Sequence, residues 1–148
     1  LKAVGCLPNV ISLGFSHHHI DSHQRQLVKI LGELAQNEVH WWGLESRLGD
    51  SRLIVSQHDM HRASTIFEQF SIDADHHQHL GLLSLIGCTE AEVGAINTLF
   101  ETTEFGLSWL NQTSSAARVA IDGEDLSQAL QLLHALIQER NTSVAQQS

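Results

Sequence analysis

Apolar residues in the second half of the chain alternate between short runs and helical stripes. The run at residues 80–87 is too short for anything but a buried strand. A stripe at helical spacing follows it, made of Val93, Ile96, Leu99 and Phe100. Residues 107–110 and 117–121 are typical of two further strands. The last stripe has i, i+3, i+4 spacing and predicts a closing helix, with Leu126, Ala129, Leu130, Leu133, Leu136 and Ile137 on its apolar face.

The first half repeats this order of elements. Residues 10–15 predict a strand, and a helix follows with the face Leu27, Ile30, Leu31 and Leu34. Residues 39–44 and 52–57 predict a strand pair across the turn at Gly49 and Asp50. A short helix then carries Ala63, Ile66, Phe67 and Phe70, and residues 72–77 predict a last strand. The repeat is roughly 65–70 residues long, so we expect two small α+β modules in tandem.

Polar residues mark where the helices should begin and end. Thr89 and Glu92 have the spacing of a capping box. Residues 21–24 are expected to cap the first helix, which should end at Asn37 and Glu38, and Asp59 is expected to cap the short helix. Residues 123–125 predict a turn that starts the closing helix.

One predicted strand is left over at the N-terminus. Residues 1–5 are extended in pattern and precede an expected turn at Pro8 and Asn9, whereas the second module has only three strands of its own. Because an open sheet edge invites aggregation, we expect this strand to complete the second module. The predicted domains are therefore 9–79 for the first module, 1–8 with 80–140 for the second, and a flexible tail at 141–148.

Composition excludes several classes of partner. The net charge of −9 argues against binding to a nucleic-acid backbone. No apolar run approaches the ~20 residues that span a bilayer, so no membrane partner is expected. Cys6 and Cys88 are too few for a disulfide framework, which predicts a reducing cytoplasm. The chain begins with Leu rather than Met, and we expect it to be a piece of a longer protein.

The candidate chemical groups have simpler structural interpretations. Imidazoles at 17–19, 23, 76, 77 and 79 are groups that zinc or nickel accepts, but no thiolate or carboxylate lies at a familiar ligand spacing. Cys88 is at a helix start, where a thiolate is favoured, yet it has no His or Asn partner at a recognisable spacing. For Trp41 and Trp42, packing is favoured over ligand stacking. We therefore expect no metal site and no catalytic residue.

The order of the elements resembles the ACT domain, a small-molecule sensing module of amino-acid metabolism. More narrowly, the chain resembles the tandem ACT regulatory region at the C-terminal end of aspartate kinases. The resemblance is carried by residues 2–4 with 9–13, the helix at 27–37, the run at 80–87, and residues 123–134. It implies an α+β fold of two ferredoxin-like βαββαβ modules, with antiparallel sheets and helices on one face.

The resemblance also implies an effector site. In the family, feedback amino acids such as lysine or threonine bind near the loop after the first strand, and a second strand completes the pocket. Free N–H groups at a helix start suit the ligand carboxylate, and Asp21 or Glu45 would take its ammonium group. The expected effector-binding residues of the first module are His19, Ile20, Asp21, Ser22, Glu45 and Ser46. Asn111, Ser114 and Ser115 either line an equivalent pocket in the second module or satisfy a turn.

This sequence departs from the family pattern within the expected pocket. The helix start usually carries a glycine followed by large apolar residues, whereas residues 23–26 read His-Gln-Arg-Gln. An aspartate is common where Trp42 stands, and the Ser/Thr-rich segment that follows is reduced to Glu45 and Ser46. The departures therefore affect the effector pocket rather than the scaffold.

The resulting functional expectation is a non-catalytic regulatory region that binds a feedback amino acid and forms a homodimer. The parent enzyme would carry an N-terminal kinase domain that transfers phosphate from ATP, with magnesium, to aspartate, in the pathway to lysine, threonine and methionine. Two alternatives stay open: a free-standing tandem ACT sensor, and a dimerisation module whose ligand pocket has decayed.

Overall fold

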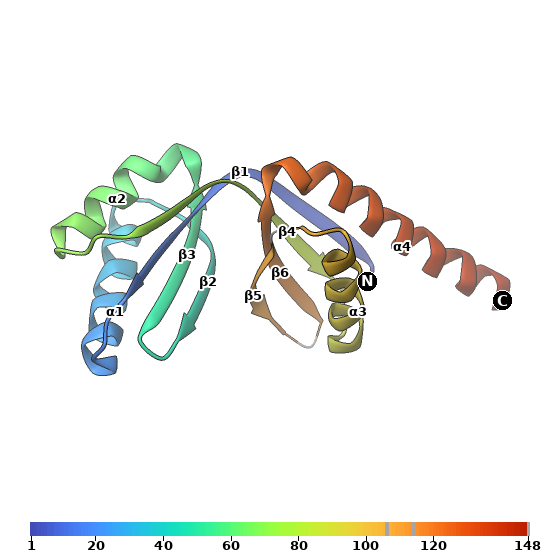
Figure 1. Cartoon of the computed structure of the whole chain (residues 1–148), viewed down its shortest axis with the longest axis horizontal. Coiled ribbons are helices and arrows are strands. Elements are labelled where there is room, and N and C mark those ends of the chain that lie inside the picture. The colour runs from blue at the N-terminus through green and yellow to red at the C-terminus, as the bar shows by residue number, and fades with distance from the viewer. Residues whose placement is uncertain (106, 114, 148) are drawn as a thin grey trace. The chain divides into compact units, whose positions relative to one another are not determined.

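The chain divides into two compact units in the computed structural model, which describes residues 1–105, 107–113 and 115–147 (Figure 1). One unit is Asn9–Leu80, and the other combines Leu1–Pro8 with Gly81–Ser148. Two long strands, β1 (Ala3–Ser16) and β4 (Asp75–Ile86), each contribute one part to each unit. The hydrogen-bonded order of the six strands is β2-β3-β1-β4-β6-β5.

The unit of residues 9–80 places two helices on one face of its strands β2-β3-β1-β4 (Figure 1). Strands β2 (Trp41–Arg47) and β3 (Asp50–Ser56) form an antiparallel hairpin, and β3 pairs antiparallel with β1. The helices are α1 (Ile20–Gln36) and α2 (Met60–Gln69). The buried core between helices and sheet consists of Ile11, Leu13, Phe15, Ile30, Leu34, Val39, Leu53, Val55, Ala63, Ile66 and Phe67.

The second unit has the same arrangement, with strands in the order β5-β6-β4-β1. Its elements are α3 (Glu90–Thr102), β5 (Leu107–Gln112), β6 (Ala116–Asp122) and α4 (Leu126–Gln147). The N-terminal strand joins this unit, where the Lys2 N–H donates to the Ile86 carbonyl at 2.8 Å. Its core includes Leu83, Leu85, Val93, Ile96, Phe100, Val119, Ile121, Ala129 and Leu133. The predicted α+β fold of two ferredoxin-like modules, completed by the N-terminal strand, is confirmed.

The strand boundaries at residues 8–9 and 77–80 were predicted wrongly. No turn interrupts β1 at Pro8 and Asn9, and the two strands expected at 72–77 and 80–87 form the single strand β4. Asn9 and His79 instead have φ values of 56° and 59°. One residue in the left-handed region redirects a strand without ending it, and Asn adopts that region more readily than most residues. The turn signal at Asn9 was therefore a local backbone bend.

Two of the three side-chain caps that the sequence predicted are absent. Thr89 does form the predicted capping box with Glu92 at the start of α3. Helix α1 instead starts at Ile20, with Asp21 inside its first turn and no side-chain cap. Asp59 pairs with Arg62 rather than capping α2, which follows directly on the 3₁₀ turn η1 (Gln57–Asp59). A carboxylate at a helix start thus has other uses than capping.

The C-terminal helix is longer than expected. Helix α4 follows the 3₁₀ turn η2 (Gly123–Asp125) and runs to Gln147, over most of the range 141–148 that was predicted to be a tail. Its buried residues Ala129 and Leu133 belong to the predicted apolar stripe. Within the described residues, no helix combines the length and apolar character needed to cross a membrane.

A glycine in β1 lets an arginine of β3 reach β4. Arg52 pairs with Gly14 in the β1–β3 register, and its guanidinium donates to Asp75 at 2.9 Å and to Ser12 at 3.3 Å. A Cβ at position 14 would lie 3.1 Å from the Arg52 Cζ and Nη1 atoms, which is tighter than ordinary contact. Gly14 therefore keeps the path of this side chain open. The Arg52 hydrogen bond is the main reason that the pKa of Asp75 lies below its ordinary value.

The capping box predicts a local stability effect. We expect Thr89→Ala to lower the free energy of unfolding by about 1 kcal/mol, because it removes the acceptor for the Glu92 N–H. Thr89→Ser should retain most of the stability. Thr98→Ala is the matched control, since Thr98 bonds only within the body of α3. Urea denaturation of the three variants measures the differences, and equal losses for Thr89→Ala and Thr98→Ala would contradict the prediction.

The Arg52 bridge predicts a change in a carboxyl titration. In Arg52→Gln, the pKa of Asp75 should rise towards its ordinary value because its main hydrogen-bond donor is lost. Arg62→Gln, which removes the partner of Asp59, should leave the Asp75 titration unchanged. Carboxyl-detected NMR titration follows both groups. An Asp75 pKa that is the same in wild type and Arg52→Gln would disprove the bridge.

Candidate functional site

The loop between β1 and α1 is short and tightly held. It consists of His17, His18 and His19, and the His17 N–H donates to the Gly49 carbonyl at 2.9 Å. Gly49 has a φ of +75°, and a Cβ there would lie 2.7 Å from the His17 carbonyl oxygen. Only glycine therefore fits at this turn of the β2–β3 hairpin without displacing the backbone.

The start of α1 has no side-chain cap. The His19 N–H donates to the His17 Nδ1 atom at 2.9 Å, and the first helical bond runs from the His23 N–H to the His19 carbonyl. The N–H groups of the first turn after His19 have no intrahelical acceptor, which is general for helix starts. Together with the positive end of the helix dipole, they can bind a carboxylate.

His23 is a functional candidate that the sequence analysis placed in a cap. Its side chain is buried, only 1% exposed, in the first turn of α1. The Nε2 atom lies 2.7 Å from the Ser51 hydroxyl, and the ring stacks at a tilt on Phe15, with centroids 4.6 Å apart. Its Nδ1 atom is buried without a partner in the described structure. The missed signal was periodicity, because His23 continues the Leu27, Ile30 and Leu34 stripe one turn earlier.

Ser51 connects His23 to the second strand. Its hydroxyl also lies 2.9 Å from the hydroxyl of Ser46, one of the predicted effector-binding residues. The hydrogen-bonded chain His23–Ser51–Ser46 therefore joins the first turn of α1 to both strands of the hairpin inside a single module. Burial lowers the pKa of His23, and the nearby Asp50 carboxylate partly opposes this effect. The hydrogen-bonded chain thus contains a neutral imidazole under ordinary conditions.

The other predicted effector-binding residues of the first module lie at the start of α1 or on β2. His19 and Asp21 are exposed, Ile20 is 43% exposed and Ser22 is half-buried, all at the start of α1. Glu45 is half-buried and pairs with Arg47 at 3.0 Å. Ser46 is the residue whose hydrogen bond through Ser51 joins it to α1.

The predicted residues of the second module are only partly described. Ser114 lies outside the described residues, and Asn111 belongs to β5 with its side chain outside the described part. Ser115 is exposed, and its carbonyl accepts from the N–H groups of Gly87 at 2.7 Å and Cys88 at 3.0 Å. Its backbone satisfies two donors, which favours the turn interpretation for this residue.

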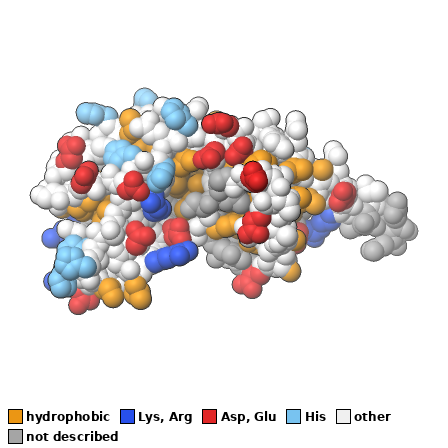
Figure 2. All heavy atoms as spheres, in the orientation of Figure 1, with side chains coloured by type: hydrophobic (Ala, Val, Ile, Leu, Met, Phe, Trp, Pro, Cys, Tyr) orange, Lys and Arg blue, Asp and Glu red, His pale blue; other side chains and the backbone are white. Residues whose placement is uncertain are grey.

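The imidazole rings of the three loop histidines pack against one another. The centroids of His17, His18 and His19 lie 4.5 to 5.6 Å apart. Histidine side chains gather at the lower left of Figure 2, where Figure 1 places the start of α1. In the described part of the chain, no group of three or more His, Cys, Asp and Glu residues is arranged to hold a metal ion.

The helix start does not favour a thiolate at Cys88 as its position suggested, whereas the packing expected for Trp41 is supported. Cys88 is buried, and burial followed by the Glu92 charge raises the pKa of its thiol, so the thiolate is disfavoured. A β-bulge between Trp41 and Gly43 removes the simple alternation of the two tryptophans. Trp41 is half-buried against the core of its unit, while the Trp42 ring packs edge-on against His40 at 4.5 Å.

Comparison with known proteins finds similarity in structure alone. By sequence, the chain matches no family model and no curated protein. The regulatory subunit of aspartate kinase from Thermus thermophilus aligns with a TM-score of 0.74 at 16% identity, over 89% of this chain and 94% of that one. The Clostridium acetobutylicum aspartate kinase aligns with a TM-score of 0.75 at 15% identity, over 85% of this chain and 32% of the enzyme.

A third match is to a structure with bound amino acids. Escherichia coli aspartokinase III in complex with lysine and aspartate aligns with a TM-score of 0.70 at 18% identity, over 92% of this chain and 33% of that protein. The chain thus spans about a third of the length of the two complete enzymes and nearly all of the regulatory subunit.

His23 predicts an acid-sensitive stability. Its pKa in the folded state is below the ordinary value of 6.5, so the unfolded chain binds more protons at acidic pH. The stabilisation is complete above pH 6.5 and is lost as the pH falls through 6.5 towards the folded pKa. We expect His23→Gln to lose less stability than wild type between pH 7 and pH 5.

The control for this prediction is His18→Gln, which removes an exposed imidazole from the adjacent loop. Urea midpoints at pH 7, 6 and 5 should fall in parallel for wild type and His18→Gln and less steeply for His23→Gln. Identical pH slopes in all three proteins would show that His23 titrates normally. The chain has the fold of aspartate kinase regulatory regions.

Proposed function

We propose that this chain is the regulatory region of an aspartate kinase, which binds a feedback amino acid and does not catalyse a reaction itself. The observation that carries the proposal is the intertwined order of elements. The N-terminal strand completes the second module. The first module is inserted in the sequence between this strand and the rest of the second module. A regulatory subunit with the same fold matches over 94% of its length.

The proposed effector site is the start of α1 in the 9–80 unit. The ligand carboxylate binds the free N–H groups of the first helical turn, beside His19, Ile20 and Ser22. Asp21, in the first turn of α1, or Glu45 of β2, which would exchange its partner Arg47, takes the ammonium group. The chain His23–Ser51–Ser46 holds the helix start against the hairpin, so it positions the site.

Regulation would follow from population shift. An amino acid that prefers one arrangement of a homodimer moves an N-terminal kinase domain, with its ATP and magnesium, towards an inactive state. Among the similar structures, Escherichia coli aspartokinase III is in complex with lysine and aspartate. Two free thiols, Cys6 and Cys88, are in keeping with a reducing cytoplasm.

A free-standing amino-acid sensor is the second candidate function. It is favoured by the regulatory subunit from Thermus thermophilus, whose whole chain is about as long as this one. The reading frame upstream of Leu1 separates the two: a kinase domain should precede Leu1 in the first case only.

Calorimetric titration of the 148-residue chain with lysine, threonine and methionine tests the proposed site. One of them should bind saturably, and Asp21→Asn or Glu45→Gln should weaken that binding about tenfold through the loss of a charged hydrogen bond. Glu139→Gln removes an exposed carboxylate from the other unit and should leave the affinity unchanged. If none of the three amino acids gives heat, the chain is better described as a dimerisation module with a decayed pocket.

A further inference from the structure

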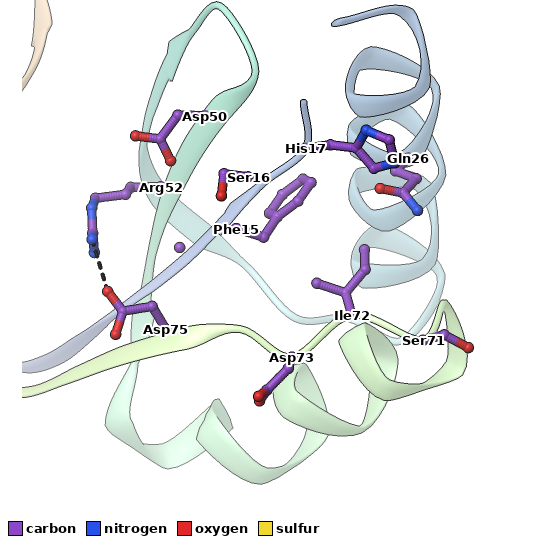
Figure 3. A pocket seen from close by; sticks show the side chains of 11 residues that line it. Phe15, Ser16, His17, Gln26, Asp50, Arg52, Ser71, Ile72, Asp73 and Asp75 are labelled. Carbon is purple, nitrogen blue, oxygen red and sulfur yellow. Dashed lines mark hydrogen bonds and ion pairs between the residues drawn. The ribbon is translucent and has the colours of Figure 1, made fainter. Parts of the chain in front are cut away.

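The 9–80 unit contains a pocket of about 350 Å³ that none of the predicted effector-binding residues lines (Figure 3). Of the β1–α1 loop, only His17 lines it. Its walls come from the end of β1, the start of β3, one residue of α1 and the segment that leads into β4. The lining residues are Gly14, Phe15, Ser16, His17, Gln26, Asp50, Arg52, Ser71, Ile72, Asp73 and Asp75.

Two of these walls are held by the backbone independently of any ligand. The close approach of Gly49 to His17 fixes the hairpin beside Asp50. On the opposite side, α2 ends in a Schellman motif: the Ser71 N–H donates to Glu68 at 2.9 Å, and the Ile72 N–H donates to Phe67 at 3.0 Å. Ser71 has a φ of 57° at the position where glycine is usual. The pocket is therefore pre-formed, as small-molecule sites usually are.

The charged groups of the pocket differ in whether they already have a hydrogen-bond or ion-pair partner in the described part of the chain. Arg52 is occupied by Asp75 and Ser12, so this guanidinium is not free for an anion. Asp50 and Asp73 have no hydrogen-bond or ion-pair partner for their carboxylates in the described part of the chain. Figure 3 shows Asp50 on the same side as the Arg52–Asp75 pair. With three aspartates and one arginine, the lining favours a cation.

The pocket also has an apolar surface. Phe15, 6% exposed, and the half-buried Ile72 lie between the charged side and Gln26 of α1 (Figure 3). A bare metal ion gains nothing from these two side chains, whereas an alkyl chain does. The volume is at the lower end of the range for small-molecule sites, which suits a ligand of few atoms.

We propose that this pocket binds a small organic cation with an ammonium group at each end of a short alkyl chain, with Asp50 and Asp73 each taking one end and Phe15 and Ile72 against the methylenes. This site goes beyond the proposed function, because it uses other residues than the amino-acid site and does not depend on it. A diamine is the simplest compound of this class.

The test is calorimetric titration of the 148-residue chain with 1,4-diaminobutane, with 1,4-butanediol as the uncharged analogue. The diamine should bind saturably and the diol should not. Asp50→Asn with Asp73→Asn should weaken diamine binding at least tenfold, since two charged partners are lost. The matched control is Glu124→Gln with Glu139→Gln, which removes two exposed carboxylates from the other unit and should leave the affinity unchanged.

Three outcomes would overturn the proposal: no saturable binding of the diamine, equal weakening by the pocket pair and the control pair, or equal binding of the diol. Displacement of the diamine by an equal concentration of magnesium chloride would also overturn it, because the site would then be an acidic metal site. Circular dichroism melting of each double variant verifies folding, and these carboxylates are exposed. Titration of Asp21→Asn with threonine or methionine, which lack a second ammonium group, reports on the amino-acid site, so the two proposals fail separately.

Discussion

Completion of the second module's sheet by a strand from the other end of the chain is the constraint on which the structure depends. The 81–148 part supplies three strands, and residues 3–8 of β1 supply the fourth. The hydrogen bond from Lys2 to Ile86 shows the pairing at one end of that strand. Backbone groups on a sheet edge need partners, and the second module therefore combines two segments that flank the contiguous first module.

Close backbone approaches also fix the segments around the candidate site. Gly49 admits the His17 carbonyl, Gly14 admits Arg52, and Ser71 ends α2 in a left-handed conformation. These positions fix the loop, the bridge and the segment before β4 without a disulfide or a metal. A rigid frame of this kind can hold uncapped N–H groups and partnerless carboxylates ready for ligands, at some cost in stability.

Periodicity predicted the fold and most of the core, because burial of one helix or strand face repeats along the chain. The stripe of Ala129 and Leu133 and the capping box at Thr89 are local patterns, and they were read correctly. The failures involve properties that arise only in three dimensions. Continuity of β1 through Pro8, the burial of His23 and the raised pKa of Cys88 each depend on neighbours distant in sequence. The Arg52–Asp75 bridge likewise crosses an intervening strand and leaves no trace in spacing.

The strand at residues 3–8 is made before the strands that it pairs with in the second module. On the ribosome, residues 9–80 emerge with all of their own strands and can fold at once, whereas residues 3–8 must wait for the partners encoded at 81–122 and the helices that cover them. At 5–20 residues per second, translation of residues 81–148 takes about 3 to 14 s. During that interval residues 3–8 lack the strand partners that residues 81–122 supply in the second module.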